Sequence, residues 1–258
     1  MCTLTVAWQV FDSHPVVVAA NRDERLDRPS TAPAEFRDGE HRVVAPRDEE
    51  AGGTWLGYND AGVVVAVTNR WVGDLGGERS RGLLVRDALR EPSADAALAV
   101  VESELDARDY EGFNLLLADA ADALLVEYDG APSATRLDPG VHVVMNVGYD
   151  TTYVVPDVRP DLARQQAENG KRLLRALLPE DGERAAGWRE RAADALGDHD
   201  YGVCIHPPEA AADGEGPAAG FGTKSSSLVA IDADGRGDYR FAPGPPCVTD
   251  YEPVDSQI

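Results

Sequence analysis

The most reactive side chain in the sequence stands at its start, where Cys2 follows the initiator Met1 directly. Methionine aminopeptidase removes Met1 before a residue this small, which would leave a cysteine with a free α-amine. An α-amine has a pKa of about 7.7–8.0 and a thiol one of about 8.5, so the amine can accept the thiol proton near neutral pH. Position alone decides little, because a cysteine is more often a small buried hydrophobic residue.

Four polar residues, Asn21-Arg22-Asp23-Glu24, follow an apolar run that we expect to return toward Cys2 as the second strand of a hairpin. The end of that strand lies beside the start of the first, so Arg22 and Asp23 should lie next to Cys2. An arginine there favours a thiolate, and an aspartate can hold an α-ammonium group. The alternative interpretation is a solvated turn of charged residues.

Amide side chains end two further predicted strands. Thr68-Asn69 closes one apolar run, and Asn146 closes a later one. Side-chain amides at such strand ends are suited to donate hydrogen bonds to an oxyanion. The sequence therefore offers a nucleophile, a base and candidate oxyanion donors.

Metal and cofactor motifs are missing from the sequence. The closest pair of possible metal ligands is Cys204 with His206, and two ligands on one strand do not make a zinc site. We also find no glycine-rich phosphate loop, no Gly-x-Ser-x-Gly, no His-Glu-x-x-His and no Cys-x-x-Cys-His. The sequence predicts no metal site and no required cofactor, and the five histidines are interpreted as structural or solvent-facing.

Hydrophobic patterning predicts strands and helices in alternating groups. Residues 4–10 with 16–20 and residues 54–58 with 63–68 form two hairpins, and residues 25–53 between them form a surface loop with at most a short strand at 42–45. The remaining predictions are helices at 79–90 and 93–107, the second capped by Ser93; strands at 113–118, 123–128 and 141–146; helices at 160–178 and 183–197; a flexible loop at 207–220; and a hairpin of 227–231 with 238–241. This order favours an α+β fold of two stacked antiparallel sheets with helices outside, as one domain over 1–258.

Charge is the unusual feature of the composition. The 258 residues carry 46 acidic and 24 basic side chains, a formal net charge of −22. That field repels nucleic acids and anionic lipids, so neither is an expected partner. Only Lys171 and Lys224 are lysines, and a carboxylate-rich surface poor in lysine is expected where molar salt screens the repulsion. We hypothesise a halophile's protein; the alternative is an acidic protein of a mesophile.

The expected location is the cytoplasm. The N-terminus lacks the pattern of a secretory signal, and no apolar run approaches the roughly 18 residues of a membrane span. Three scattered cysteines, Cys2, Cys204 and Cys247, are an odd number that argues against a disulfide framework. A reducing compartment is consistent with both observations.

Six short motifs together resemble the NRDE family, also called transport and Golgi organisation protein 2-like. They are Met1-Cys2-Thr3, AANRDE at 19–24, GGTWLG at 52–57, Thr68-Asn69, GFNL at 112–115 and GTKSS at 222–226. The resemblance covers nearly the whole chain except residues 180–220. The sequence departs from the expected pattern at Lys224, where we expect arginine, and at Arg70-Trp71.

The resemblance implies a four-layer αββα fold of the N-terminal nucleophile hydrolase type, similar more distantly to the cysteine amidases of the penicillin V acylase and bile salt hydrolase group. By motif position it implies catalytic roles for Cys2, Arg22, Asp23 and Asn146. The family motifs further point to substrate-binding roles for Asn21, Glu24, Thr68, Asn69, Asn114, Thr223 and Lys224.

Two functions remain open at this point. One is hydrolysis of an amide or thioester bond in a small acylated metabolite by Cys2. The other follows from relatives implicated in haem trafficking and lipid metabolism: a non-catalytic carrier of haem or of an acyl-CoA or lipid in the same cleft. A purely structural acidic protein ranks lowest, because it leaves the polar strand ends around Cys2 unexplained.

The charge composition generates the first prediction. If repulsion among carboxylates opposes folding, the free energy of unfolding should be clearly larger in molar KCl than in dilute buffer, because salt at about 1 M shortens the Debye length to about 3 Å. Urea unfolding followed by circular dichroism at both salt concentrations measures this. Equal stability in the two buffers would contradict the halophile hypothesis.

Overall fold

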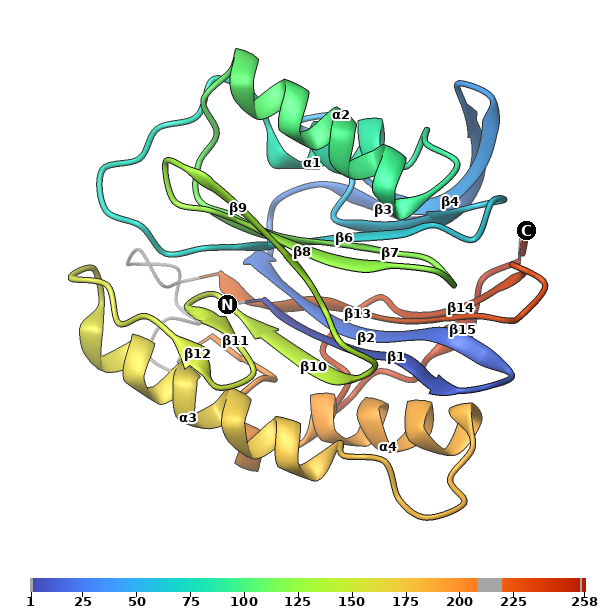
Figure 1. Ribbon diagram of the computed structural model, residues 1–258. Helices are drawn as coiled ribbons and strands as arrows, with labels where there is room; N and C mark the ends of the chain where they lie inside the picture. Colours follow the sequence, from blue (N-terminus) through green and yellow to red (C-terminus); the bar gives the residue numbers. More distant parts are fainter. Residues whose placement is uncertain (1, 208–219, 256) are drawn as a thin grey trace.

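Two antiparallel sheets lie face to face, and a pair of helices covers the outer face of each (Figure 1). The computed structural model describes residues 2–207, 220–255 and 257–258. The helices α1 and α2 lie on one side of the stacked sheets and α3 and α4 on the other. The predicted α+β sandwich of two stacked antiparallel sheets is confirmed.

The first sheet contains strands from both ends of the chain, and its strand β2 carries the predicted Arg22 and Asp23. Its strand order is β12-β11-β10-β1-β2-β13-β14-β15. The strands are β1 (Thr3–Phe11), β2 (His14–Arg25), β10 (Gly140–Met145), β11 (Gly148–Tyr149), β12 (Thr152–Tyr153), β13 (Phe221–Ile231), β14 (Gly237–Ala242) and β15 (Glu252–Pro253). Helices α3 (Pro160–Ala176) and α4 (Ala185–Gly197) cover its outer face, and a short 3-10 helix, η1 (His199–Tyr201), follows.

The second sheet follows the chain more simply. Its order is β3-β4-β5-β6-β7-β8-β9. The strands are β3 (Ser30–Asp38), β4 (His41–Asp48), β5 (Leu56–Asn59), β6 (Val64–Asn69), β7 (Phe113–Ala118), β8 (Ala123–Tyr128) and β9 (Pro132–Arg136). Helices α1 (Arg81–Ala88) and α2 (Ala94–Ala107) cover it.

Three apolar layers separate these four layers of secondary structure. One cluster, which includes Leu4, Val18 and Leu116, fills the space between the two sheets. A second lies between the first sheet and α3 and α4, and a third between the second sheet and α1 and α2. Both faces of each sheet are therefore covered over its central strands, which explains why those strands are continuous apolar runs rather than alternating ones.

The residues at their N-termini determine where helices α2 and α3 begin. The Ser93 hydroxyl accepts a hydrogen bond from the backbone N–H of Ala96, which confirms the predicted cap of α2. Helix α3 starts with Pro160, whose fixed φ suits the first turn. Among the described residues, no helix is long and apolar enough to cross a membrane.

The expectation of a surface loop over residues 25–53 was wrong. Apart from the turns at its ends, most of this stretch forms β3 and β4, a hairpin at the edge of the second sheet. Pro33 lies where the β3–β4 register shifts between Thr31 and Ala34, at a bulge where a missing N–H costs little. Edge strands carry charged and proline residues, so their sequence resembles that of a loop.

Two further differences concern the strands β9 and β13. β9 was not predicted, because this exposed edge strand lacks an apolar run. β13 starts at Phe221, well before the predicted start at Ser227. The predicted flexible loop at 207–220 falls mostly on residues 208–219, which lie outside the described residues.

The packing between the sheets generates the second prediction. A Cβ added at Gly237 would overlap the ring of Tyr58, which is completely buried. Gly237→Ala should therefore lower the free energy of unfolding by about 1–3 kcal/mol through overpacking. Gly76→Ala is the matched control, because no atom lies within 4 Å of its new Cβ, and its effect should stay within about 0.5 kcal/mol. Equal stability of both variants in urea titrations would refute this packing argument.

Candidate active site

Cys2 lies directly before β1, at the end of the first sheet where β2 finishes. Thr3 pairs with Asn21, so Arg22 and Asp23 continue β2 alongside Cys2. The Cys2 thiol lies 3.7 Å from the backbone carbonyl oxygen of Asp23, to which it can donate a weak hydrogen bond. The predicted meeting of Cys2 with this part of β2 is therefore present.

Asn146 reaches Cys2 from the end of β10. Its Oδ1 atom accepts hydrogen bonds from the backbone N–H of Cys2 at 3.2 Å and from the Gln166 side chain of α3 at 3.0 Å. Its Nδ2 atom donates to the backbone carbonyl of Asn69. Three partners thus fix this amide, whose residue is 1% exposed, and its carbonyl faces the nitrogen of Cys2.

Asp23 is buried beside Thr223 of β13, its register partner. The Thr223 hydroxyl donates to Asp23 Oδ1 at 2.6 Å and itself accepts from the backbone N–H of Ile205 at 2.8 Å. Burial raises the pKa of Asp23 from its ordinary 3.8 to about 6, although the bond from Thr223 acts in the opposite direction. A carboxyl with this pKa changes its charge in the range in which many enzymes work.

Arg22 points to the other face of β2, into the space between the sheets. Its guanidinium carbon lies 3.9 Å from the ring centroid of Trp55, which belongs to the segment before β5. Its Nη2 atom lies 3.8 Å from a Glu24 carboxylate oxygen and 3.7 Å from one of Asp48. Burial lowers the pKa of Arg22, and these two carboxylates oppose that shift.

The thiol of Cys2 has a raised pKa. Burial is the main cause, and the charge of Asp23 adds to it, whereas Arg22 and the hydrogen bond to the Asp23 backbone lower the pKa. The expected effect of Arg22 is thus present but is outweighed by loss of solvent. The side chain is therefore a neutral thiol at rest, and it needs a base to become a nucleophile.

Two of the predicted ligand-binding amides are engaged within the protein. Asn21 Nδ2 donates to the backbone carbonyls of Leu196 and Val203, both at 2.9 Å. Asn114 Nδ2 donates to the Thr68 hydroxyl at 3.1 Å and to the backbone carbonyl of Met145 at 3.0 Å. These amides join neighbouring segments around the site, and Asn114 also links the two sheets, because Thr68 belongs to β6 and Met145 to β10.

Glu24 and Lys224 lie at the margin of the site. A Glu24 oxygen lies 3.9 Å from Arg28 in addition to its contact with Arg22. Lys224 is the extra residue of a bulge in β13, and its ammonium group donates to the backbone carbonyl of Leu26 at 2.6 Å. The same bulge lets Thr223 remain opposite Asp23.

A cleft of about 620 Å³ has Asn69 and Asn146 in its wall, and Asn146 connects it to Cys2 through the hydrogen bond to the Cys2 backbone. Three arginines, Arg70, Arg81 and Arg159, line it together with one acidic residue, Glu111. The apolar part of its wall consists of Trp71, Val72, Leu75, Val158, Leu162, Ile205 and Phe221. In a chain of net charge −22, this basic and partly apolar cleft stands apart from the general charge.

Cys2 itself borders a second, much smaller cavity between the sheets. Its volume is about 20 Å³, and Arg22, Trp55 and Thr68 also line it. That volume holds about one water molecule. Cys2 therefore borders the small cavity, whereas Asn146, which is hydrogen-bonded to Cys2, borders the large cleft.

Comparison of the sequence with family descriptions decides its classification. The model of the family described as Transport and Golgi organisation 2 matches residues 1–240. The chain belongs to the Transport and Golgi organisation 2 family. A curated relative, the Transport and Golgi organization protein 2 homolog of Bos taurus, is 29% identical over 257 residues, which cover 88% of each chain.

Solved structures extend the comparison of this Transport and Golgi organisation 2 family chain to its fold. Penicillin V acylase from Agrobacterium tumefaciens is similar with a TM-score of 0.59 and 16% identity, over 94% of this chain and 83% of that one. The N-acylethanolamine-hydrolyzing acid amidase ortholog of Caenorhabditis elegans has a TM-score of 0.57 and 12% identity, over 88% of this chain and 92% of that one. The likeness confirms the implied hydrolase-type fold.

Sequence reasoning missed several residues around the site of this family member. Gln166, which holds Asn146, is 1% exposed and stands four residues after Leu162, on the buried stripe of α3, where a polar residue is itself a signal. Arg81 is half-buried in the cleft wall, where its guanidinium donates to the backbone carbonyl of Gly112 at 2.8 Å. Nothing in the sequence around Arg81, in the first turn of α1, indicated that it lines a cleft.

Burial of Asp23 generates the third prediction. Its native pKa of about 6 exceeds the ordinary 3.8, so the native state binds this proton more tightly and stability from this group falls as pH rises through about 6. The shift corresponds to about 3 kcal/mol. The wild type should therefore lose about 3 kcal/mol of free energy of unfolding as pH rises from about 4 to about 7, and Asp23→Asn should not. Urea unfolding of both proteins across this pH range measures the difference.

Thr223→Val provides the companion test. It removes the hydroxyl that favours the carboxylate, so the pKa of Asp23 should rise further. The Asp23 carboxyl resonance, followed by NMR across the same pH range, reports the midpoint directly. A midpoint near 3.8 in the wild type, or one unmoved by Thr223→Val, would contradict the interpretation.

Proposed function

We propose that the protein is an N-terminal cysteine hydrolase that cleaves an amide or thioester bond in a small acylated metabolite. The observation that carries the proposal is the hydrogen bond between the backbone nitrogen of Cys2 and Asn146 Oδ1, at 3.2 Å. That nitrogen becomes the α-amine once Met1 is removed. A buried amide already oriented toward it is the support that a catalytic amine needs.

In the proposed reaction, the Cys2 thiol passes its proton to the α-amine, and the sulfur attacks the acyl carbonyl carbon. The carbon–nitrogen or carbon–sulfur bond of the tetrahedral adduct then breaks, and the leaving amine or thiol takes the proton from the α-ammonium. A thioester to Cys2 remains. Water, deprotonated by the same amine, attacks this thioester, which releases a carboxylic acid and restores the thiol.

The neighbouring residues have separate proposed roles. Asn146 positions the α-amine, and Gln166 holds Asn146 in that orientation. Because Asn146 Nδ2 donates to the Asn69 backbone, we assign the oxyanion contact to the Asn69 side chain, which lines the cleft. Arg22 and Asp23 set the charge around the sulfur and the amine, as positioning residues rather than acid and base.

The cleft beside Cys2 supports a substrate with an apolar part and a negative group. Trp71, Val158 and Phe221 supply apolar wall. Arg159 supplies positive charge, whereas Arg70 is paired with Glu127 and Arg81 with Glu111. The names of the structural neighbours, an acylase and an amidase, point in the same direction for the scissile bond. At 16% identity or less, they support the bond class through fold alone.

A second candidate function is a carrier of haem or of an acyl-CoA or lipid, without chemistry. Arg159 of the cleft favours it, because a guanidinium group pairs with the carboxylates of a haem or the phosphates of a coenzyme A. Arg70 and Arg81 would have to exchange Glu127 and Glu111 for such a ligand. Haem would then be cargo rather than a cofactor. This function needs the cleft but not the thiol of Cys2.

The fourth prediction separates the two functions. Cys2→Ser should lower turnover of acyl amides and acyl-CoA thioesters by about 10⁴-fold or more, because the nucleophile is lost. Intact mass should show that Met1 is absent from the active wild type, and circular dichroism serves as the fold control for the variant. In parallel, haemin is titrated into both proteins.

Turnover that disappears in Cys2→Ser supports the hydrolase. Saturable haemin binding that is equal in both proteins, with no turnover in either, supports the carrier and contradicts the hydrolase. Turnover that survives in Cys2→Ser contradicts the assigned nucleophile. Retention of Met1 on a fully active protein contradicts the amine as base.

A further inference from the structure

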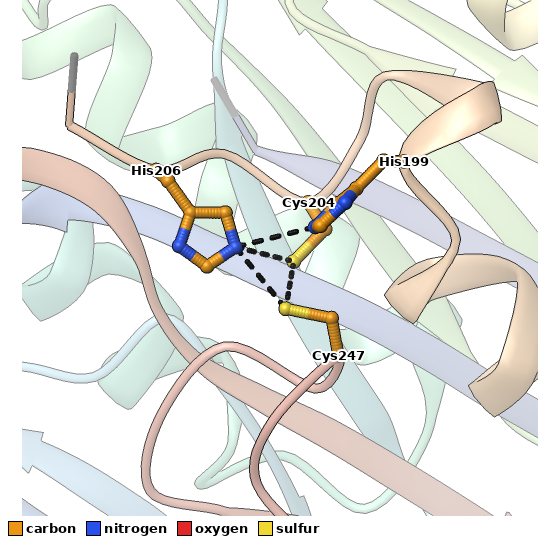
Figure 2. A group of neighbouring side chains, drawn as sticks. All are labelled: His199, Cys204, His206 and Cys247. Atoms are coloured by element: carbon orange, nitrogen blue, oxygen red, sulfur yellow. Dashed lines mark hydrogen bonds between the residues drawn. The ribbon is translucent and has the colours of Figure 1, made fainter. Parts of the chain in front are cut away.

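Four side chains with metal-binding atoms meet on the outer side of the first sheet, at the end of α4 (Figure 2). They are His199 of η1, Cys204 and His206 of the following segment, and Cys247 of the loop after β14. Each offers one ligand atom, and these atoms all lie within 4.8 Å of one another. Figure 2 shows the two imidazoles and two sulfurs pointing toward one common space.

Four of the six distances within this cluster, which we call the histidine–cysteine cluster, are close to those of a tetrahedron around one ion, and the two from His199 to the cysteine sulfurs are at most 4.8 Å. His199 Nε2 lies 3.3 Å from His206 Nε2, and the two cysteine sulfurs lie 3.4 Å apart. His206 Nε2 lies 3.1 Å from the Cys247 sulfur and 3.8 Å from that of Cys204. Zinc bonds of about 2.3 Å to sulfur and about 2.0–2.1 Å to nitrogen require edges of about 3.3–3.8 Å.

We propose that His199, Cys204, His206 and Cys247 bind one zinc ion as a structural site. Two thiolates and two imidazoles are a donor set that selects zinc among abundant divalent ions. Binding releases the two thiol protons, so the charge of the ion is balanced by the two thiolates. Four protein ligands leave no open position for substrate, so the ion holds the chain rather than taking part in chemistry.

The sequence interpretation of no metal site rested on Cys204 and His206 alone. The fold adds His199 from before this pair and Cys247 from a distant loop. That loop packs closely on the end of α4, because a Cβ added at Gly197 would lie 3.3 Å from the backbone nitrogen of Cys247. Helix-end packing therefore brings in the fourth ligand, which sequence spacing does not reveal.

The surroundings of the cluster favour a cation. Asp194, Asp198 and Asp250 line the depression that also contains His199 and Cys247. These carboxylates add negative potential around the ligands and attract a divalent ion. The wall of the depression is otherwise built from the end of α4 and the loop after β14.

A metal here would connect the C-terminal loop to the candidate active site. Ile205 stands between two ligands, and its backbone exchanges two hydrogen bonds with Thr223: its N–H donates to the hydroxyl, and its carbonyl accepts from the N–H at 2.8 Å. Thr223 in turn donates to Asp23. His206 and Ile205 also line the large cleft. The zinc would thus fix the segment that orients Asp23.

The test uses the reduced full-length protein and the metal ions alone. Wild-type protein is loaded with Zn²⁺, desalted and analysed by elemental mass spectrometry, and a second sample is loaded with Co²⁺ for absorption spectra. We expect one zinc per chain and, with cobalt, the strong visible bands of a tetrahedral thiolate complex together with thiolate charge transfer. Cys247→Ser and His206→Ala should lose stoichiometric binding, and zinc should raise the Tm of the wild type but of neither variant.

Cys2→Ser is the matched control, because it removes the third cysteine, which lies outside the cluster, and it should bind zinc like the wild type. Full zinc binding by Cys247→Ser overturns the proposal, as does wild-type protein that takes up no zinc or shows no tetrahedral cobalt spectrum. Isolation of the wild type with a Cys204–Cys247 disulfide that persists in reductant also overturns it. The wild-type measurements decide the question even if a variant does not fold.

Discussion

The position of β2 between β1 and β13 controls the arrangement of the candidate active site. Antiparallel pairing fixes Thr3 opposite Asn21 on one side and Thr223 opposite Asp23 on the other. Because side chains of a strand alternate between its faces, Arg22 enters the space between the sheets while Asp23 faces the opposite way. A register slip of one residue would exchange these environments, placing the Asp23 carboxyl between the sheets and the Arg22 guanidinium on the other face.

Burial of the charged groups at this site costs solvation free energy. Arg22 is 7% exposed and Asp23 is 3% exposed, and burial shifts the pKa of each toward its neutral form. The contacts of Arg22 with Trp55, Glu24 and Asp48 and of Asp23 with Thr223 recover part of that cost. Core packing on both sides of the first sheet supplies the remaining stability, since one apolar layer lies on each of its faces.

Local patterns in the sequence predicted most elements of the fold. The hairpin of β1 and β2, the cap at Ser93 and both helical pairs follow from hydrophobic runs and capping chemistry, which act over a few residues. The β3–β4 hairpin was missed because an edge strand needs charge and tolerates proline, as Pro33 shows. Its pattern is that of a loop.

The candidate site was also predictable only where neighbouring segments of the chain form it. Cys2, Arg22 and Asp23 could be grouped from the sequence, because one hairpin connects them. The engagement of Asn21 with Leu196 and Val203 depends on the packing of α4, which no local pattern encodes. The histidine–cysteine cluster depends on a loop contact across 43 residues, between Cys204 and Cys247. What remained hidden was the set of contacts made by tertiary packing alone.

The long separation of the site residues along the chain has a consequence for biosynthesis. Asn146 is 144 residues from Cys2, and Thr223 is 200 residues from Asp23. During translation the cysteine leaves the ribosome first, but β10 and β13, which complete its surroundings, emerge much later. The nascent chain therefore carries its thiol without the groups that orient it. Since such distant pairings form slowly, the site assembles only after Thr223 has been made, which ties its maturation to synthesis far beyond Cys2.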